Sequence, residues 1–249
     1  MTGVSRRVGI GHAIAKRLLD DGAAVVTTGF APHDEEMPWD TDAGGAAQAL
    51  AEHPAAERWY ELPPEDLSDP EVPERLVTGA MDRFGGLDVL IANHARSSHD
   101  GLDDVTVEEL DACWAINARA SLLLARSLKR RRAAGPGGRL VLFTSGQHIG
   151  PMSNEIAYAV SKGAIHQMTA SLSDALIDAG ITVNCINPGP TDTGYATGAF
   201  EQKIAGMFPG GRWGRPEDVA NLVSWLASDE SAWITGQIID SEGGFRRWS

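Results

Sequence analysis

Short apolar runs alternate with longer stretches of helical periodicity along the whole chain. Most of the runs are apolar at every position, which is typical of parallel strands covered by helices on both faces. The alternation continues through residues 1–249 without a linker, repeat or low-complexity stretch, which indicates one domain. We therefore predict an α/β fold, a single doubly wound domain with a mostly parallel sheet. The predicted strands span residues 23–28, 58–62, 87–92, 139–144, 181–186 and 237–240.

The helices expected between these strands have recognisable ends. The first helix is predicted to start near His12 and to stop at Gly22, and the next has a cap and a first-turn proline at Asp69-Pro70. Thr106 and Glu109 form a capping box before a helix that runs to about Arg132. A later helix stops at Gly180, and the last one starts at Pro216. Two long segments, residues 30–45 and 188–218, follow the carboxyl ends of predicted strands, where open α/β sheets bind ligands. We expect residues 188–218 to form a loop or lid over the substrate.

Charge and cysteine content limit the partners and the compartment of the protein. The formal net charge of -13 disfavours nucleic acid and anionic membranes, which would repel the chain. The sequence has no run of about 18 apolar residues, so we predict no membrane span. Cys113 and Cys185 lie far apart in apolar stretches, as reduced core thiols do, which predicts a cytoplasmic protein. Histidines, cysteines and acids are not at the spacings of a metal site, so we predict no metal.

A serine, a tyrosine and a lysine carry the strongest chemical signal. Tyr158 and Lys162 are one helical turn apart, and Ser145 ends a predicted strand shortly before them. A phenol has an ordinary pKa of about 10, and we expect the Lys162 ammonium to lower the pKa of Tyr158. A hydroxyl opposite the phenol would hold a carbonyl or alcohol oxygen between two donors. The alternative is an ordinary amphipathic helix face, but the serine favours a proton-transfer site.

The chain resembles the classical short-chain dehydrogenase/reductase family over nearly its whole length. The family's catalytic residues match Asn117 in WAINARAS together with Ser145, Tyr158 and Lys162. Its Pro-Gly turn and its C-terminal segment match NPGPTDT and ITGQIIDSEGG. The resemblance implies a Rossmann-like, NAD(P)-dependent oxidoreductase that interconverts a carbonyl and a secondary alcohol, similar to 3-oxoacyl-(acyl carrier protein) reductases. It also implies a homo-oligomer, either a tetramer or a dimer, and a role for Asn117 in holding a water that links Lys162 to solvent.

The opening TGVSRRVGIG predicts a turn that binds the cofactor pyrophosphate at the start of a helix. Gly3, Gly9 and Gly11 would let the backbone approach the phosphates, although the turn is two residues longer than the family pattern. The strand that should precede this turn is missing, and no other segment of the sequence substitutes for it. We expect either that the true start lies upstream and the chain is clipped, which we favour, or that the remaining sheet closes by rearrangement.

The residue at the end of the strand after the glycine turn determines which dinucleotide is preferred. NAD-preferring relatives carry an acidic residue there for the ribose hydroxyls, but the matching position is Gly29. Arg6 and Arg7 in the lengthened turn would suit a 2′-phosphate, which favours NADP(H) over NAD(H). Asp34 is the acidic alternative, a few residues further on, and the two arginines could instead belong to a solvated loop.

The resemblance implies further contacts with the cofactor and the substrate. The complete predicted cofactor set is Gly3, Ser5, Arg6, Arg7, Gly9, Ile10, Gly11, Asp66, Leu67, Asn93, Ala95, Tyr158, Lys162, Pro188, Gly189, Thr191 and Thr193. Ala95 replaces a family glycine and places a methyl group where the backbone passes the cofactor ribose. The predicted substrate pocket is Gln147, His148, Met152 and Tyr195.

These residues predict an oxidoreductase that transfers hydride between NADP(H) and a carbonyl or secondary alcohol substrate, with Tyr158 as general acid or base. The resemblance implies a 3-oxoacyl thioester, a small ketone, a sugar or a polyol as the substrate. Two alternatives stay open: an NAD-linked alcohol dehydrogenase, and a non-catalytic regulatory module that binds a dinucleotide.

Overall fold

The computed structural model describes residues 1–35, 37, 42, 44–194 and 198–248. The strands are β1 (Val25–Thr27), β2 (Trp59–Glu61), β3 (Val89–Ala92), β4 (Gly138–Phe143), β5 (Ile181–Asn187) and β6 (Ile238–Asp240). The main helices are α1 (Ile10–Asp20), α2 (Pro32–Glu35), α3 (Gly45–Ala51), α4 (Val72–Phe84), α5 (Val107–Cys113), α6 (Ala120–Arg131), α7 (Ile156–Ile177), α8 (Gly198–Gly206) and α9 (Pro216–Ala227). The six predicted strands are confirmed, each within a few residues.

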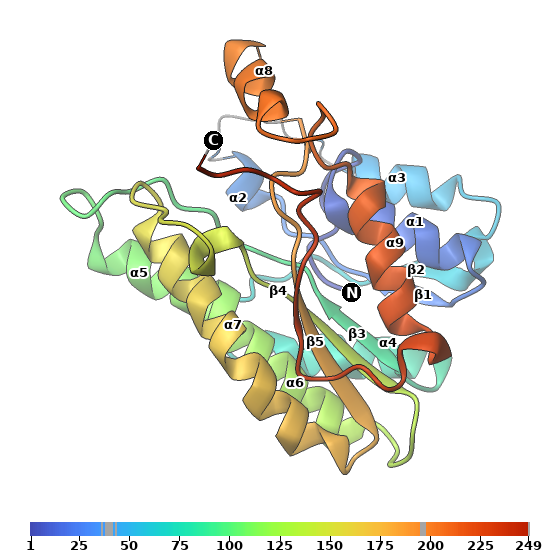
Figure 1. Cartoon of the computed structure of the whole chain (residues 1–249). Coiled ribbons are helices and arrows are strands. Elements are labelled where there is room, and N and C mark those ends of the chain that lie inside the picture. Colours follow the sequence, from blue (N-terminus) through green and yellow to red (C-terminus); the bar gives the residue numbers. More distant parts are fainter. Residues whose placement is uncertain (36, 38–41, 43, 195–197, 249) are drawn as a thin grey trace.

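All strand pairs are parallel, and helices cover both faces of the sheet (Figure 1). Side chains alternate between the faces because successive residues of a strand point in opposite directions. Leu140 and Leu142 pack with α6 and α7 on one face, whereas Val141 and Phe143 pack with α1 and α9 on the other. Each strand therefore needs apolar residues at every position, which is why the strands could be read from the sequence. The predicted doubly wound α/β fold is confirmed.

The sheet is divided at the place of the expected first strand. β1 and β2 form one part, and β3, β4, β5 and β6 form the other. Among the described residues only Thr2 bridges the two parts, pairing with Thr28 and with Ala92. Beneath it lies a cleft of about 860 Å³ lined by β1, β3 and the helices around them. The two parts of the sheet thus meet at Thr2, beside this cleft.

The amino group of Met1 is buried beside this cleft and donates a hydrogen bond to the Val26 carbonyl at 2.6 Å. Burial lowers the pKa of this amino group from 8.0 to about 5, because the charged form loses its hydration. Backbone hydrogen bonds from Thr2 to Ile91 and from Val4 to Thr28 hold the following residues against both parts of the sheet. This short stretch is what positions the glycine turn.

Several local predictions need correction. The helix after β2 starts at Val72 with Pro73 in its first turn, and Asp69 accepts a hydrogen bond from the backbone of Glu71 just before it. The long central helix is interrupted by a π-helix, η2 (Trp114–Arg119), between α5 and α6. The segment 188–218 contains α8, and the polar segment 30–45 contains α2. The described residues also include three short 3₁₀ turns, η1 (Ala56–Arg58), η3 (Gly146–His148) and η4 (Asp229–Ser231).

Candidate active site

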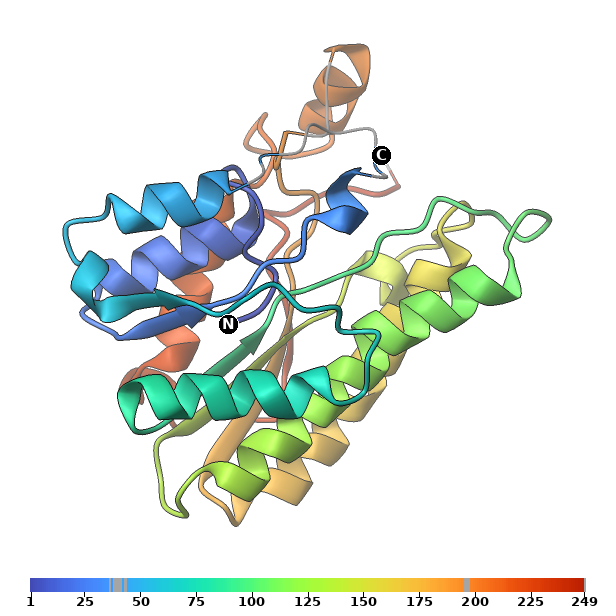
Figure 2. The same ribbon diagram turned by 180° about the vertical axis from the view of Figure 1, so that it is seen from behind.

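A cleft of about 820 Å³ lies at the carboxyl ends of the strands, beside the glycine turn. Figures 1 and 2 show α8 beyond this edge of the sheet. Open α/β sheets bind ligands at this edge. Most of the predicted site residues line it: Gly3, Ser5, Arg6, Gly9, Ile10, Gly11, Asp66, Leu67, Asn93, Ala95, Ser145, Met152, Tyr158, Pro188, Gly189, Thr191 and Thr193. Arg7, Asn117, Gln147, His148 and Lys162 are not among the described lining residues, and Tyr195 lies outside the described residues.

The glycine turn is packed so closely that side chains would not fit. A Cβ on Gly11 would lie 2.2 Å from the Gly3 carbonyl oxygen, and one on Gly3 would lie 2.7 Å from the His94 backbone nitrogen. Gly3 also has φ +74°, which L side chains rarely adopt. α1 begins at Ile10, directly after the turn, so its free backbone N–H groups and positive dipole end face the cleft. These features fit the pyrophosphate of a dinucleotide.

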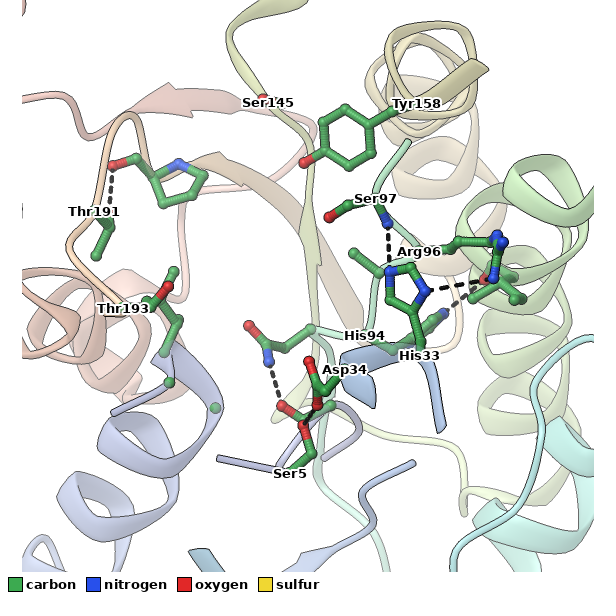
Figure 3. A pocket seen from close by; sticks show the side chains of 18 of the residues that line it. Ser5, His33, Asp34, His94, Arg96, Ser97, Ser145, Tyr158, Thr191 and Thr193 are labelled. Atoms are coloured by element: carbon green, nitrogen blue, oxygen red, sulfur yellow. Dashed lines mark hydrogen bonds between the residues drawn. The ribbon is translucent and has the colours of Figure 1, made fainter. Parts of the chain in front are cut away.

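The far end of the cleft, next to α2, brings charged groups together (Figure 3). Ser5 donates a hydrogen bond to the Asp34 carboxylate at 2.8 Å. The Arg6 guanidinium donates to the Thr193 carbonyl at 2.8 Å. Arg7, the second predicted phosphate ligand, lies outside the cleft, where it is exposed and pairs with Asp42 at 3.3 Å. The lengthened turn points these neighbouring arginines in different directions, so Arg6 alone of the pair reaches the cleft.

Sequence reasoning missed two residues at this end of the cleft, His33 and Arg96. The ring of His33, from α2, accepts a hydrogen bond from the Ser97 backbone at 3.0 Å. Arg96 makes a two-pronged ion pair with Glu109 at 2.8 Å (Figure 3). The contact between His33 and Ser97 joins the segment after β1 to the segment after β3 across the cleft. A polar loop in the sequence gives no signal for such a contact.

Ser145 lies two residues after β4, and Tyr158 lies beside it in the first turn of α7 (Figure 3). The predicted pocket residues Gln147 and His148 do not face the cleft, because η3 turns them back toward Ser145. Gln147 accepts from the Ser145 backbone at 3.2 Å, and His148 bonds the Ser145 carbonyl at 3.1 Å. His148 is itself held by Asp240 at 3.1 Å. These two side chains thus hold the backbone of Ser145 without lining the cleft.

The expectation that Lys162 lowers the pKa of Tyr158 is wrong, because this pKa is raised. Burial raises the pKa of Tyr158 to about 12, and the hydrogen bond with Ser145 offsets this only in part. Lys162 is 2% exposed, and its ammonium donates to the Phe143 carbonyl at 2.9 Å. Burial lowers the pKa of Lys162 to about 8. The cost of burying charge therefore exceeds the mutual effect of the two groups, which spacing along a helix could not reveal.

Asn117 lies in η2 and is completely buried. Its amide accepts from the Arg96 backbone at 2.7 Å and donates to the Arg96 carbonyl at 2.9 Å. It also donates to the Ser161 hydroxyl at 2.8 Å, one residue before Lys162. Asn117 thus ties the segment after β3 to the tyrosine–lysine helix.

The substrate end of the cleft is mostly apolar. Met152 lines it as predicted, with Phe200 and Ile204 from α8 and with Trp213. The ring centroids of Phe200 and Trp213 lie 6.0 Å apart in an edge-to-face arrangement. Arg247, near the C-terminus, also lines the cleft and was not predicted. It pairs with Glu242, and a Cβ on Gly146 would collide with its guanidinium.

The family described as Enoyl-(Acyl carrier protein) reductase matches residues 3–246. The chain belongs to the short-chain dehydrogenase/reductase family. It is 38% identical over 249 residues to "Uncharacterized oxidoreductase YjdA" of Bacillus subtilis, covering 99% of this chain and 96% of that protein. It is 31% identical to the "NADPH-dependent aldehyde reductase-like protein, chloroplastic" of Arabidopsis thaliana, covering 98% of this chain and 92% of that protein.

Solved structures of this short-chain dehydrogenase/reductase family have the same fold. A blue fluorescent protein from a metagenomic library, in complex with NADPH, has a TM-score of 0.85 at 29% identity, covering 98% of this chain and 95% of that one. A dehydrogenase/reductase from Sinorhizobium meliloti has a TM-score of 0.83 at 34% identity, covering 98% of this chain and 92% of that one. The protein is therefore an NAD(P)-dependent oxidoreductase.

Two further findings concern the described residues. No group of three or more His, Cys, Asp or Glu side chains among them is arranged to hold a metal ion. None of the helices in that part of the chain has both the length and the hydrophobicity needed to cross a bilayer.

Proposed function

We propose that this short-chain dehydrogenase/reductase is an NADP(H)-dependent carbonyl reductase that also runs in the alcohol-oxidising direction. The observation that carries the proposal is that the Tyr158 hydroxyl lies beside Ser145 in the same cleft that the glycine turn borders (Figure 3). One cleft can then hold the dinucleotide on the turn and a carbonyl oxygen between the two hydroxyls. The nicotinamide supplies the hydride, since no side chain can donate one.

The residues around the carbonyl take distinct roles. Ser145 donates a hydrogen bond that orients the substrate oxygen, and Tyr158 donates the proton to it during reduction. A neutral Tyr158 with a pKa of about 12 holds that proton at neutral pH, which suits the reductive direction. Lys162 and Asn117 position the tyrosine helix from behind, since both are buried and neither lines the cleft.

Two observations support the choice of NADP(H). Arg6 lines the cleft with its guanidinium on the Thr193 carbonyl, and Gly29, also in the lining, carries no side chain that would repel a 2′-phosphate. One relative's name and one solved neighbour's title refer to NADPH. The specific observation for the runner-up, NAD-linked alcohol oxidation, is the Asp34 carboxylate hydrogen-bonded to Ser5 at the same end. A carboxylate favours ribose hydroxyls and repels a phosphate.

The apolar wall of the substrate end favours a ketone or an acyl thioester over a sugar or polyol. Met152, Phe200 and Ile204 offer no hydrogen bonds to the several hydroxyls of a sugar, which would lose their hydration in such a pocket. A ketone presents one polar atom, and Ser145 and Tyr158 satisfy it.

Exposed apolar side chains on neighbouring helices support a homo-oligomer. Val107 is 67% exposed on α5, Trp114 is 50% exposed on η2, and Val160 is 57% exposed on α7. These three elements pack against one another. Exposed apolar side chains on adjacent helices are typical of an interface between subunits. The buried free thiols of Cys113 and Cys185 are in keeping with a reducing compartment such as the cytoplasm.

The test follows NADPH and NADH absorbance with a panel of aliphatic ketones, aromatic ketones and 3-oxoacyl thioesters. We expect NADPH oxidation with at least one of them, and a loss of about 10²–10⁴-fold in kcat for Tyr158→Phe with cofactor affinity unchanged. Cofactor binding without turnover of any substrate would favour the regulatory module instead. Faster turnover with NADH would favour the NAD-linked alternative.

A further inference from the structure

His94 is a buried side chain to which the reaction outlined above gives no role. It follows β3 and is 7% exposed. Its Nδ1 lies 2.7 Å from the Thr2 hydroxyl, at the start of the glycine turn. Its Nε2 lies 2.9 Å from the carbonyl oxygen of Ile116, in η2. The imidazole therefore connects the glycine turn with the π-helix, two elements far apart in the sequence, and His94 is one of the residues that line the cleft (Figure 3).

The partners of His94 fix its tautomer. A carbonyl oxygen can only accept a hydrogen bond, so the proton is on Nε2 and is donated to Ile116. Nδ1 is then an acceptor, and the Thr2 hydroxyl donates to it. Burial and the nearby Lys162 ammonium lower the pKa of His94 to about 3, so the ring keeps this neutral form near neutral pH. Both hydrogen bonds have a defined direction.

The turn-side end of this connection is rigid. The backbone of Gly3 is packed on the backbone of His94, where a Cβ on the glycine would be 2.7 Å from the His94 nitrogen. Asn93 donates to the Gly3 carbonyl at 2.9 Å, and Thr2 donates its backbone N–H to Ile91 at 3.1 Å. If the turn shifts when it binds a pyrophosphate, the segment that carries His94 must therefore shift with it.

The other end reaches the catalytic side of the cleft. Ile116 directly precedes Asn117, whose amide holds the Arg96 backbone and the Ser161 hydroxyl. Residues 114–119 form a π-helix, in which the backbone hydrogen bonds are wider than in an α-helix and a carbonyl is more readily shared with an outside donor. Holding the Ile116 carbonyl thus positions Asn117 and, through Ser161, the helix of Tyr158.

We propose that His94 is a positioning residue that couples occupation of the glycine turn to the geometry of the Asn117 segment. It acts through the Thr2 hydroxyl on one side and the Ile116 carbonyl on the other. The inference rests on the proposed function only in taking the glycine turn to be the dinucleotide site. Cofactor binding would then order η2 or shift it slightly, before any substrate is present.

The experiment compares the full-length protein with Thr2→Val, His94→Leu and a control, Thr169→Val. Thr2→Val removes only the hydroxyl that bonds His94. Thr169 is completely buried and donates to the Ile165 carbonyl at 2.8 Å, so its substitution removes a buried hydrogen bond that does not reach the glycine turn. NADPH affinity is measured by titrating nicotinamide fluorescence, and amide hydrogen exchange of residues 114–119 is measured with and without NADPH.

In the wild type we expect NADPH to slow exchange in residues 114–119. In Thr2→Val and His94→Leu we expect about tenfold weaker NADPH binding and loss of this protection, whereas Thr169→Val keeps both. Protection and affinity like those of the wild type in Thr2→Val overturn the coupling, and this variant decides the matter even if His94→Leu does not fold. Failure of the wild type to bind NADPH or NADH would instead overturn the proposed function, so the two failures are distinct.

Discussion

The ammonium of Lys162 lies 5.6 Å from the centroid of the Tyr158 ring and donates its hydrogen bond to the Phe143 carbonyl, not to the phenol. The lysine is thus beside the tyrosine without being bonded to its oxygen. Because the phenol loses hydration in the cleft, its neutral form is favoured, and the pKa of Tyr158 rises from 10.0 to about 12. A cationic nicotinamide, when bound, would add positive charge to the site and favour the phenolate.

The first prediction concerns ionisation of Tyr158. In a spectrophotometric titration of tyrosinate absorbance, the difference between wild type and Tyr158→Phe should show one group that ionises near pH 12 without cofactor. Added NADP⁺ should move that transition to lower pH. Tyr60→Phe is the control, because Tyr60 is 40% exposed on β2, away from the cleft. A Tyr158 transition near neutral pH in the cofactor-free protein would mean that Lys162 dominates after all.

The second prediction concerns the pH dependence of stability. The pKa of Lys162 is about 8 in the folded protein against 10.5 in the unfolded chain, so the unfolded chain binds more protons between these values. The contribution of Lys162 to the free energy of unfolding is therefore least favourable below pH 8 and improves as pH rises to 10.5, by at most about 1.4 kcal/mol per pH unit.

Lys162→Met keeps the volume of the side chain and removes the charge, so this improvement should vanish. We expect the variant to be at least as stable as the wild type at pH 7 by denaturant unfolding, while kcat falls by about 100-fold or more. Parallel stability curves for the two proteins between pH 8 and 10.5 would show that the ammonium is not buried as described.

The third prediction tests the glycine turn. Gly11→Ala places a Cβ 2.2 Å from the Gly3 carbonyl oxygen, so the turn must open. We expect a loss of about 1–3 kcal/mol in the free energy of unfolding and at least tenfold weaker NADPH binding. Gly86→Ala is the matched control, since a Cβ there meets no atom within 4 Å. If Gly11→Ala bound NADPH as tightly as Gly86→Ala, the turn would not be the phosphate site.

The sequence predicted the strands well because a sheet covered on both faces requires apolar residues throughout. Val141 and Phe143 face one helix layer while Leu140 and Leu142 face the other, and this leaves an uninterrupted apolar run. The positions of Ser145 and Tyr158 in the cleft could also be predicted, because the end of a strand and one turn of a helix fix where these two side chains can lie.

Features that depend on burial or on long-range contacts could not be predicted. The pKa of Tyr158 is set by burial, which spacing does not report. Arg247 reaches the cleft from the C-terminus over Gly146, and His33 reaches it from α2. His148 was placed in the pocket from its position between the serine and the tyrosine, yet a 3₁₀ turn directs it toward Asp240. In each case the deciding contact joins residues far apart in the sequence or depends on a turn with no distinct signal.

The fourth prediction separates the two neighbouring arginines of the turn. Arg6 lines the cleft and bonds the Thr193 carbonyl, whereas Arg7 is exposed and pairs with Asp42. Removing a guanidinium that contacts a 2′-phosphate weakens binding of NADPH but hardly affects NADH, which lacks that phosphate. Arg6→Ala should therefore raise the Kd for NADPH about tenfold or more and the Kd for NADH much less. Arg7→Ala, the control on the adjacent residue, should change neither.

Asp34→Asn provides the opposite test at the same end of the cleft. The Asp34 carboxylate, held by Ser5, would repel a 2′-phosphate, and an amide of the same shape would not. The substitution should tighten NADPH binding by a few-fold and leave NADH binding unchanged or weaker. Fluorescence titrations of both coenzymes with both variants give the result directly. If Arg6→Ala weakened NADH as much as NADPH while Asp34→Asn abolished NADH binding, the carboxylate would be reading a ribose diol, and the cofactor would be NAD(H).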